Sequence, residues 1–389
     1  MSHVKMNRSR LSQIRHQIGI QAKRLVIKIG SHVLTQAQGL NREIVAQLTD
    51  QIAHLKAEGR EVIMVSSGAI AAGSKKMGLP GRPQGIPQKQ AVAAIGQSTL
   101  MLTYEEAFAP YGLKVAQLLL TRDDLANRRR YLNARNTLFT LLNWGVIPII
   151  NENDTVVVEE IRFGDNDNLS AMIASLAGAD LLVILTDTDG LYDCDPRQHP
   201  EARLIPLVEK IDSRLEKAAS QLPGVLGCGG MSSKLQAAKK ASAAGIPVII
   251  ANGLTPAILE QVCRGADSAG TLFLPQLKKL SSRQYWIAYT LNPKGEIVVD
   301  DGARQVLLHQ GKSLLPAGIV KVNGRFGVGA PVRLTDAEGQ VIGMGLSNYS
   351  SQDIALIKGL KTAEIEQSLG HKGYDEVVHR DNMVVFTEA

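Results

Sequence analysis

The chain has 389 residues, of which 44% are hydrophobic and 21% charged, values that are ordinary for a globular protein of two or three domains. Its formal net charge of +6 arises in the first 24 residues, which hold six basic and no acidic side chains, and the other 37 basic and 37 acidic residues balance. A neutral body argues against a broad nucleic-acid surface, and without an apolar run of about 18 residues no membrane span is expected.

The basic segment 1–23 is predicted to be a partly ordered N-terminal extension, with a transit peptide as the alternative. The three cysteines, Cys194, Cys228 and Cys263, are far apart and do not have metal-ligand spacing. They are therefore interpreted as free thiols in a reducing compartment, which favours a cytoplasmic protein.

From residue 24 onward the chain alternates short apolar strands with longer helices. Strands are predicted at 24–30, 61–65, 114–120, 146–150, 181–185 and 247–251, and helices at 41–58, 88–109, 131–144, 168–178, 231–244 and 255–263. Alternation of this kind predicts an α/β fold, a three-layer αβα sandwich around a mostly parallel sheet, over residues 24–280.

Polar residues follow four of these strands where each one ends. They are Gly30-Ser31, Ser66–Gly68, Asn151–Asp154 and Thr186-Asp187. In open parallel sheets ligands bind outside the carboxyl ends of the strands. We therefore expect these residues to line one crevice.

The segment Asp165-Asn166-Asp167-Asn168 stands directly before an apolar helical run. One Asp or Asn is enough to cap a helix, so four in succession favour a polar-ligand site. Plain turn chemistry is the alternative.

Two lysines indicate a phosphate ligand. Lys28 interrupts an apolar strand, and Lys234 lies in the first turn of a helix that follows a glycine-rich loop at 227–230. A cation in the first turn opposes the helix dipole, whereas a helix N-terminus favours an anion. No G-x-G-x-x-G motif and no complete P-loop is present, so phosphoryl transfer is favoured over dinucleotide binding. A solvated lysine on a flexible loop is the alternative.

Eight motifs of the sequence match those of a known family. They are 26–31 (VIKIGS), 65–73 (VSSGAIAAG), 119–122 (LLTR), 133–135 (NAR), 151–154 (NEND), 164–170 (GDNDNLS), 185–187 (LTD) and 229–234 (GGMSSK). In this order they resemble the amino-acid kinases, and specifically the glutamate 5-kinase family, over about residues 24–380.

The resemblance implies ATP-dependent phosphorylation of the glutamate γ-carboxylate. The catalytic residues it implies are Lys28, Asp167 and Lys234, with Asp167 holding the two lysines. Those implied for glutamate are Ser67, Gly68, Asn151, Asp154, Asp165 and Asn166. Those implied for ATP are Lys28, Thr186, Asp187, Cys228, Gly229, Gly230, Met231, Ser232, Ser233 and Lys234. Mg²⁺ is expected mainly on the nucleotide phosphates, with no metal cage of protein ligands. Arg162 stands where a lysine is common and is left out of the catalytic set.

After about residue 280 short strand-like runs at 296–299, 318–322 and 331–334 predict a small β-rich barrel. Segments 301–303, 313–319 and 343–349 resemble a PUA domain, which would occupy 281–389 with a core at about 292–371. Eight basic and eight acidic residues balance over that core, so RNA binding is not expected.

The resemblance also implies inhibition by proline, with 78–87 as a flap, a homo-oligomer (dimer or tetramer) and a functional link to glutamyl phosphate reductase. Two alternatives stay open on the sequence alone. One is a sister kinase that acts on another carboxylate or phosphate, and the other is an RNA-binding protein with a relic kinase domain.

Overall fold

The computed structural model describes residues 8–36, 39–81, 83–156, 166–212, 215–216, 230–276 and 279–386. The chain divides into two compact units, Met1–Lys279 and Leu280–Ala389, which are described separately. Within these ranges no helix has both the length and the apolar character needed to cross a membrane.

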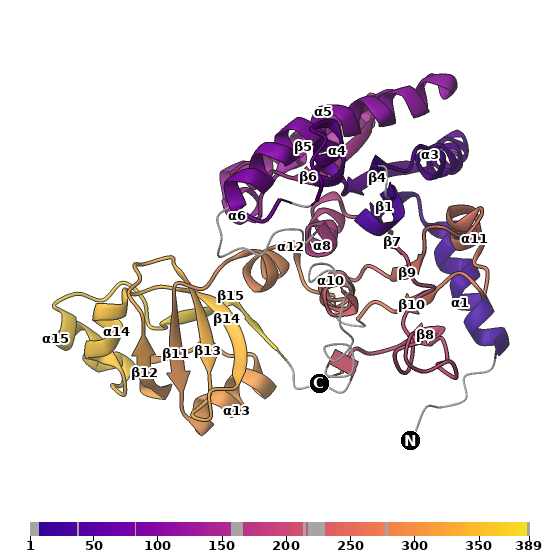
Figure 1. Ribbon diagram of the computed structural model, residues 1–389. Coiled ribbons are helices and arrows are strands. Elements are labelled where there is room, and N and C mark those ends of the chain that lie inside the picture. Colours follow the sequence, from indigo (N-terminus) through magenta and orange to yellow (C-terminus); the bar gives the residue numbers. More distant parts are fainter. Residues whose placement is uncertain are drawn as a thin grey trace. The chain divides into compact units, whose positions relative to one another are not determined.

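The first unit is built on an eight-stranded sheet (Figure 1). Its strands are, in spatial order, β5 (Val115–Leu120), β6 (Ile147–Glu152), β4 (Glu61–Ser66), β1 (Arg24–Ile29), β7 (Leu181–Thr186), β9 (Val248–Asn252), β10 (Thr271–Phe273) and β8 (Leu207–Val208). The first six are mutually parallel, β10 is antiparallel to β9, and β8 is parallel to β10. Strands β2 (Thr35–Gln36) and β3 (Gly39–Leu40) form a separate small hairpin.

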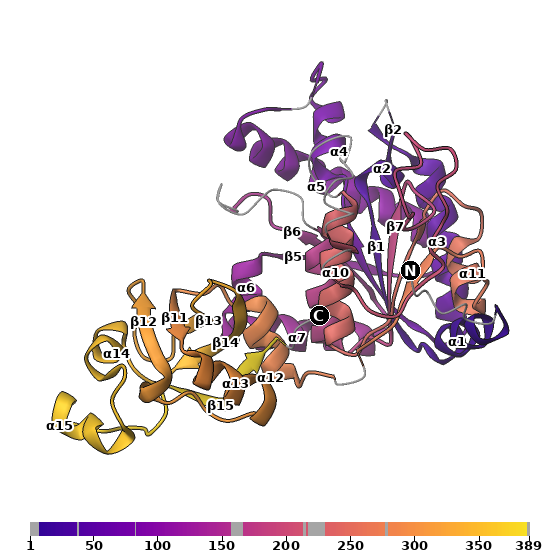
Figure 2. The ribbon, with the colours of Figure 1, turned by 90° about the horizontal axis from the view of Figure 1, so that it is seen from below.

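Helices cover both faces of this sheet (Figures 1 and 2). One layer contains α3 (Arg42–Ala57), α5 (Ile86–Phe108) and α11 (Ile258–Arg264), and the other contains α7 (Arg128–Asn143), α8 (Asn166–Ala177) and α10 (Met231–Ala243). The short helices α2 (Ser31–Leu34), α4 (Ala69–Lys76), α6 (Arg122–Ala126) and η1 (Ala109–Tyr111) lie in the connections. The predicted three-layer αβα sandwich is confirmed.

The alternation of side chains along β1 orients the one lysine in that strand. Leu25, Ile27 and Ile29 are fully buried in the core that includes residues of α3, α5 and α11. Successive side chains of a strand point to opposite faces, so Val26 and Lys28 point toward α8. The strand therefore directs an ammonium group into the layer where α8 begins.

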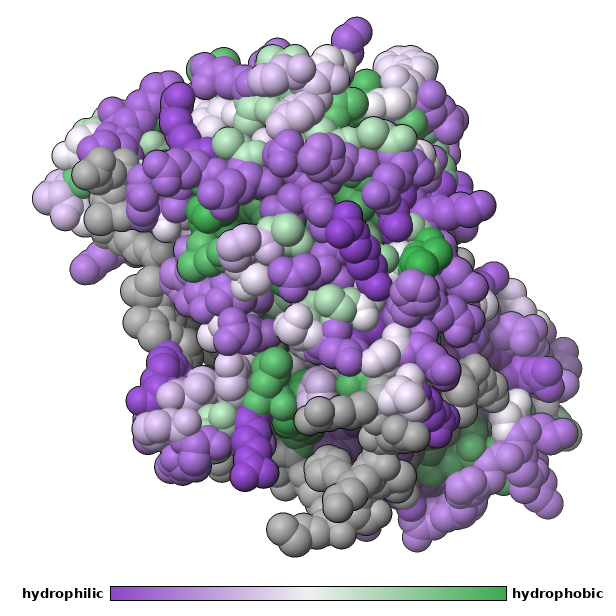
Figure 3. Space-filling view, turned by 90° about the vertical axis from the view of Figure 1, so that its right-hand side faces the viewer, coloured by the Kyte–Doolittle hydropathy of each residue, from purple (hydrophilic) through white to green (hydrophobic). Residues whose placement is uncertain are grey.

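An N-terminal helix, α1 (Arg8–Gln21), packs against α11. Its Arg15 is 1% exposed and donates hydrogen bonds to four carbonyl oxygens, those of Pro206 (2.7 Å), Gly270 (2.6 Å), Ala269 (3.0 Å) and Ala266 (3.3 Å). The sequence predicted a partly ordered extension for this segment. Helix α1 belongs to the first folded unit. The molecular surface on the side where α1 lies is mostly hydrophilic (Figure 3).

Glycines allow the close approach of α1 to α11. A Cβ atom at Gly19 would lie 2.6 Å from the carbonyl oxygens of Val262 and Cys263. A Cβ atom at Gly265, whose φ is +74°, would lie 2.4 Å from the backbone of His16. Side chains at either position would push the two helices apart.

The second unit holds a five-stranded mixed sheet in the order β12 (Ile319–Asn323), β11 (Gly295–Val299), β13 (Pro331–Thr335), β14 (Val341–Ser347) and β15 (Val378–Val385). Only β11 and β13 pair in parallel. Around it lie α12 (Ser282–Tyr285), the π-helical turn η2 (Trp286–Thr290), α13 (Asp301–Gln310), η3 (Pro316–Gly318), α14 (Ser351–Ile357), η4 (Thr362–Glu364) and α15 (Ile365–Leu369). The three predicted strands are present as β11, β12 and β13.

Replacing Arg15 with alanine should destabilise the first unit. The change leaves buried carbonyl oxygens without a donor, which predicts a loss of roughly 2–3 kcal/mol in the free energy of unfolding. Arg10→Ala on the same helix is the matched control, since Arg10 is exposed. Chemical denaturation of both variants measures the difference, and equal stabilities would show that α1 is only loosely attached.

Candidate active site

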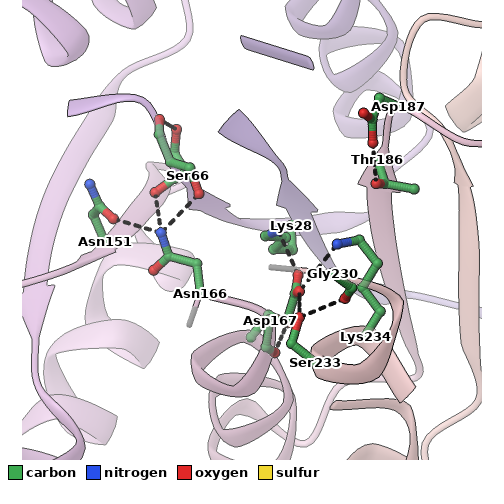
Figure 4. Close-up of polar contacts among 12 residues, drawn as sticks. Lys28, Ser66, Asn151, Asn166, Asp167, Thr186, Asp187, Gly230, Ser233 and Lys234 are labelled. Atoms are coloured by element: carbon green, nitrogen blue, oxygen red, sulfur yellow. Dashed lines mark hydrogen bonds and ion pairs between the residues drawn. The ribbon is translucent and has the colours of Figure 1, made fainter. Parts of the chain in front are cut away.

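Residues at the carboxyl ends of β1, β4 and β6 contact the first turn of α8 (Figure 4). Two consecutive residues of that turn, Asn166 and Asp167, are buried, and their side chains reach different groups. One group contains amides and hydroxyls, and the other contains the two lysines singled out in the sequence.

The lysine group consists of Lys28, Asp167 and Lys234, which are 5%, 1% and 5% exposed. Lys28 Nζ lies 2.5 Å from Asp167 Oδ1, and Lys234 Nζ lies 3.4 Å from Asp167 Oδ2. Burial alone would raise the pKa of Asp167, but the positive charges of Lys28 and Lys234 lower it to about 2. Burial lowers the pKa of Lys234, with Asp167 opposing that shift and Lys28 adding to it.

Helix α10 brings a further donor to the same carboxylate. The Ser233 hydroxyl lies 2.6 Å from Asp167 Oδ2 and 2.9 Å from the Gly230 carbonyl oxygen. Gly230 is the N-cap of α10 and, having no side chain, leaves the first N–H groups of the helix without a side-chain cap. Met231 and Ser232 begin the helix, and Ser232 is exposed.

The amide group surrounds Asn166. Its Nδ2 donates to Ser67 Oγ (2.9 Å), to Asn151 Oδ1 (3.0 Å) and to the Ser66 carbonyl oxygen (3.2 Å). Its Oδ1 is buried and accepts no hydrogen bond from any described residue. Because an unsatisfied buried acceptor is costly, this oxygen indicates a ligand that donates a hydrogen bond there.

Backbone geometry fixes the end of β4 beside this group. Ser67 N–H donates to the carbonyl oxygen of Ile29, which joins the ends of β4 and β1. The next residue, Gly68, is the N-cap of α4 and has φ +101°, in the left-handed region, where a side chain would be strained. The buried Tyr104 hydroxyl lies 2.9 Å from Ser66 Oγ and supports the strand from the opposite layer.

Asp154 follows the end of β6 and is half-buried. Burial raises the pKa of its carboxyl group to about 6. The group is therefore poised to respond to a nearby cation, which would favour the ionised form.

Thr186 and Asp187 stand at the carboxyl end of β7, apart from the lysine group in Figure 4. Thr186 Oγ1 donates to Asp187 Oδ1 (3.0 Å), and His32 Nδ1 lies 3.5 Å from Asp187 Oδ2. His32 was not among the predicted site residues. Its only sequence signal is its position two residues after Gly30.

Four residues named from the sequence, Arg162, Asp165, Cys228 and Gly229, lie outside the described residues. Within the described ranges no cluster of three His, Cys, Asp or Glu side chains could hold a metal ion. The two described cysteines, Cys194 and Cys263, are free thiols.

Comparison with known sequences identifies the family. Residues 23–252 match the amino acid kinase family, and residues 295–369 match the PUA domain. The glutamate 5-kinase of Geobacter sulfurreducens (strain ATCC 51573 / DSM 12127 / PCA) is 57% identical over 366 residues, which cover 94% of this chain and 98% of the relative. The chain belongs to the glutamate 5-kinase family.

Other glutamate 5-kinases are nearly as similar. That of Meiothermus ruber is 54% identical over 94% of this chain and 96% of its own length, and that of Pelobacter propionicus (strain DSM 2379 / NBRC 103807 / OttBd1) is 52% identical over 96% and 100%. The resemblance seen in the sequence motifs is confirmed. The protein is therefore a kinase of the glutamate 5-kinase family with a C-terminal PUA domain.

Proposed function

We propose that this kinase transfers the terminal phosphoryl group of ATP to the γ-carboxylate of L-glutamate, forming L-glutamyl 5-phosphate, the first step of proline biosynthesis from glutamate. One observation carries the proposal. The first turn of α8 presents an amide acceptor to one side and, from the next residue, a carboxylate that holds two buried lysines to the other. An amino acid and a nucleotide phosphate fit these two sides.

The lysine side suits the transferring group. Phosphoryl transfer needs positioned positive charge more than a covalent partner, because the transition state spreads negative charge over the phosphoryl oxygens. Lys28 and Lys234 supply that charge, and Asp167 keeps both ammonium groups near one point. Membership of the kinase family makes ATP the expected phosphoryl donor. Mg²⁺ would arrive bound to the phosphates of that nucleotide.

The nucleotide would extend from the lysines along α10. Gly230 leaves the first N–H groups of α10 open to a phosphate, and a helix N-terminus favours an anion. Thr186, Asp187 and the first residues of α10 complete the proposed ATP site.

The amide side suits glutamate. The unsatisfied Asn166 Oδ1 can accept from the α-ammonium group, and the Asp154 carboxylate can pair with the same charge. Ser67 and Asn151, which contact Asn166, and the neighbouring Gly68 offer polar groups that can hold the carboxylates. Recognition of both ends would select an amino acid whose side-chain carboxylate reaches the lysines.

The direct test is ATP-dependent acyl-phosphate formation, trapped with hydroxylamine, across a panel of carboxylate substrates. Wild-type protein should give hydroxamate with L-glutamate in preference to aspartate or N-acetylglutamate. Lys28→Met and Lys234→Met should each lower kcat on the order of 10²–10³-fold, since each removes one preorganised charge. Lys294→Met, at an exposed position, is the control. Near-normal turnover in both site variants would refute the mechanism.

The raised pKa of Asp154 predicts a pH dependence of glutamate binding. The carboxylate must be ionised to bind an ammonium group, and it becomes protonated as the pH falls through about 6. The glutamate KM should therefore be flat above that pH and rise about ten-fold per pH unit below it, with little change in the ATP KM. Asp154→Asn should raise the glutamate KM above pH 6, abolish the pH dependence, and converge with wild type at low pH, where Asp154 is itself uncharged.

Asp123→Asn is the matched control for this measurement, because Asp123 is an exposed acid. It should keep the wild-type profile. If the wild-type glutamate KM does not change between pH 7 and pH 5, Asp154 does not pair with the ammonium group.

Proline inhibition is proposed to act at the same pocket. Proline shares an α-carboxylate and an α-nitrogen with glutamate, so the two should compete. The connection between α4 and α5, which contains Gly78, Pro80 and Gly81, is the proposed flap, although Ile86 and Pro87 already belong to α5. Saturating glutamate should restore full velocity, and Asn166→Ala should weaken both ligands together. Inhibition that persists at saturating glutamate would place proline elsewhere.

A further inference from the structure

The Ser233 hydroxyl and the Lys234 ammonium group share one carboxylate oxygen. Both approach Asp167 Oδ2, the hydroxyl to 2.6 Å and the ammonium nitrogen to 3.4 Å (Figure 4). Lys28, on the other oxygen, is at 2.5 Å. The two ion pairs are therefore unequal, and the longer one is on the oxygen that also accepts from Ser233.

One hydroxyl proton cannot serve both acceptors near Ser233 at once. The Gly230 carbonyl oxygen lies 2.9 Å from Ser233 Oγ, farther than the Asp167 oxygen. An ionised carboxylate is the stronger acceptor, and charge-assisted hydrogen bonds are the shorter ones. The proton therefore goes to Asp167, and the hydroxyl competes with the Lys234 ammonium group for the same carboxylate oxygen.

We propose that Ser233 is a positioning residue which, by bonding Asp167, keeps Lys234 from closing onto that carboxylate and leaves it available to the transferring phosphoryl group. The inference rests on the proposed function, in which Lys234 acts on the nucleotide. It gives Ser233 a role through Asp167 rather than in direct contact with ATP.

The effect of Ser233→Ala should differ from the effect of losing a purely structural hydrogen bond. Without the hydroxyl, Asp167 Oδ2 regains a free lone pair beside a buried ammonium group, and the contact between Lys234 and Asp167 should tighten. A tighter ion pair compensates for the lost bond, so folding stability should change little. Turnover should fall instead, by roughly 10- to 100-fold, because Lys234 must now be drawn away from a closer partner.

Four proteins test this: wild type, Ser233→Ala, Ser233→Thr and Ser98→Ala. Ser233→Thr keeps the hydroxyl and should retain turnover to within about three-fold of wild type. Ser98→Ala makes the same chemical change at an exposed serine of α5, outside the proposed site, and should leave kcat unaltered. The glutamate KM should be the same in all four, because the amide pocket around Asn166 is untouched.

A crystal structure of Ser233→Ala supplies a readout that does not depend on the substrate. The Lys234 Nζ to Asp167 Oδ2 distance should fall from 3.4 Å to about 2.8 Å, the length of a charge-assisted hydrogen bond. An unchanged distance, or a Ser233→Ala variant with wild-type turnover, overturns the proposal. If wild type makes no acyl phosphate from glutamate, the proposed function fails, and the distance still decides whether Ser233 holds Lys234 off the carboxylate.

Discussion

The buried contact of Asp167 with two lysines is the interaction on which the site depends. Two cations and one anion are brought together where each residue is no more than 5% exposed. The three side chains therefore carry a net charge of +1. Such an excess is costly away from water unless another anion joins it. A phosphoryl group with its developing negative charge is an anion of that kind, which connects the electrostatics of the fold directly to phosphoryl transfer.

The N-termini of two helices add to the positive electrostatic potential at the lysine group. Helix α8 begins at Asn166, and α10 begins at Met231, and the first turns of both contribute side chains to the lysine group. The partial positive charge of a helix N-terminus stabilises ionised Asp167 and opposes Lys234. Lys234 is therefore held at some cost, by Asp167 and by the fold, in a place that a bound phosphate would make favourable.

The pattern of the sequence was sufficient for the longer strands and helices of residues 24–280, but it did not predict helix α1. Each predicted strand and helix is present, because apolar runs such as Leu25–Ile29 are buried on both faces of a sheet and leave little ambiguity. The lysines and the Asn-Asp pair also stood out, since charged or amide groups beside apolar runs need a partner. Short elements such as β8 and β10 were missed, because two or three residues carry no detectable period.

The roles of Arg15 and Ser233 could not be predicted from the sequence, because they depend on contacts between distant segments. Arg15 looked like one more charge in a basic extension, and only the carbonyl oxygens of Pro206, Ala269 and Gly270 explain why it is buried. Ser233 looked like one of two equivalent serines at a helix start. The structure separates them, because one faces Asp167 and the other faces solvent.

Two neighbouring residues at the start of α8 can serve two different ligands. Side chains of consecutive helical residues point about 100° apart around the axis, so a helix that starts between two groups can give one residue to each. Asn166 reaches the ends of β4 and β6, and Asp167 reaches β1 and α10. Since the two side chains share one backbone, the distance between the amide pocket and the lysines is fixed by the helix itself. A fixed distance of this kind would select an acceptor by length, because only a carboxylate at the right reach from its α-ammonium group would meet the phosphoryl group beside both lysines.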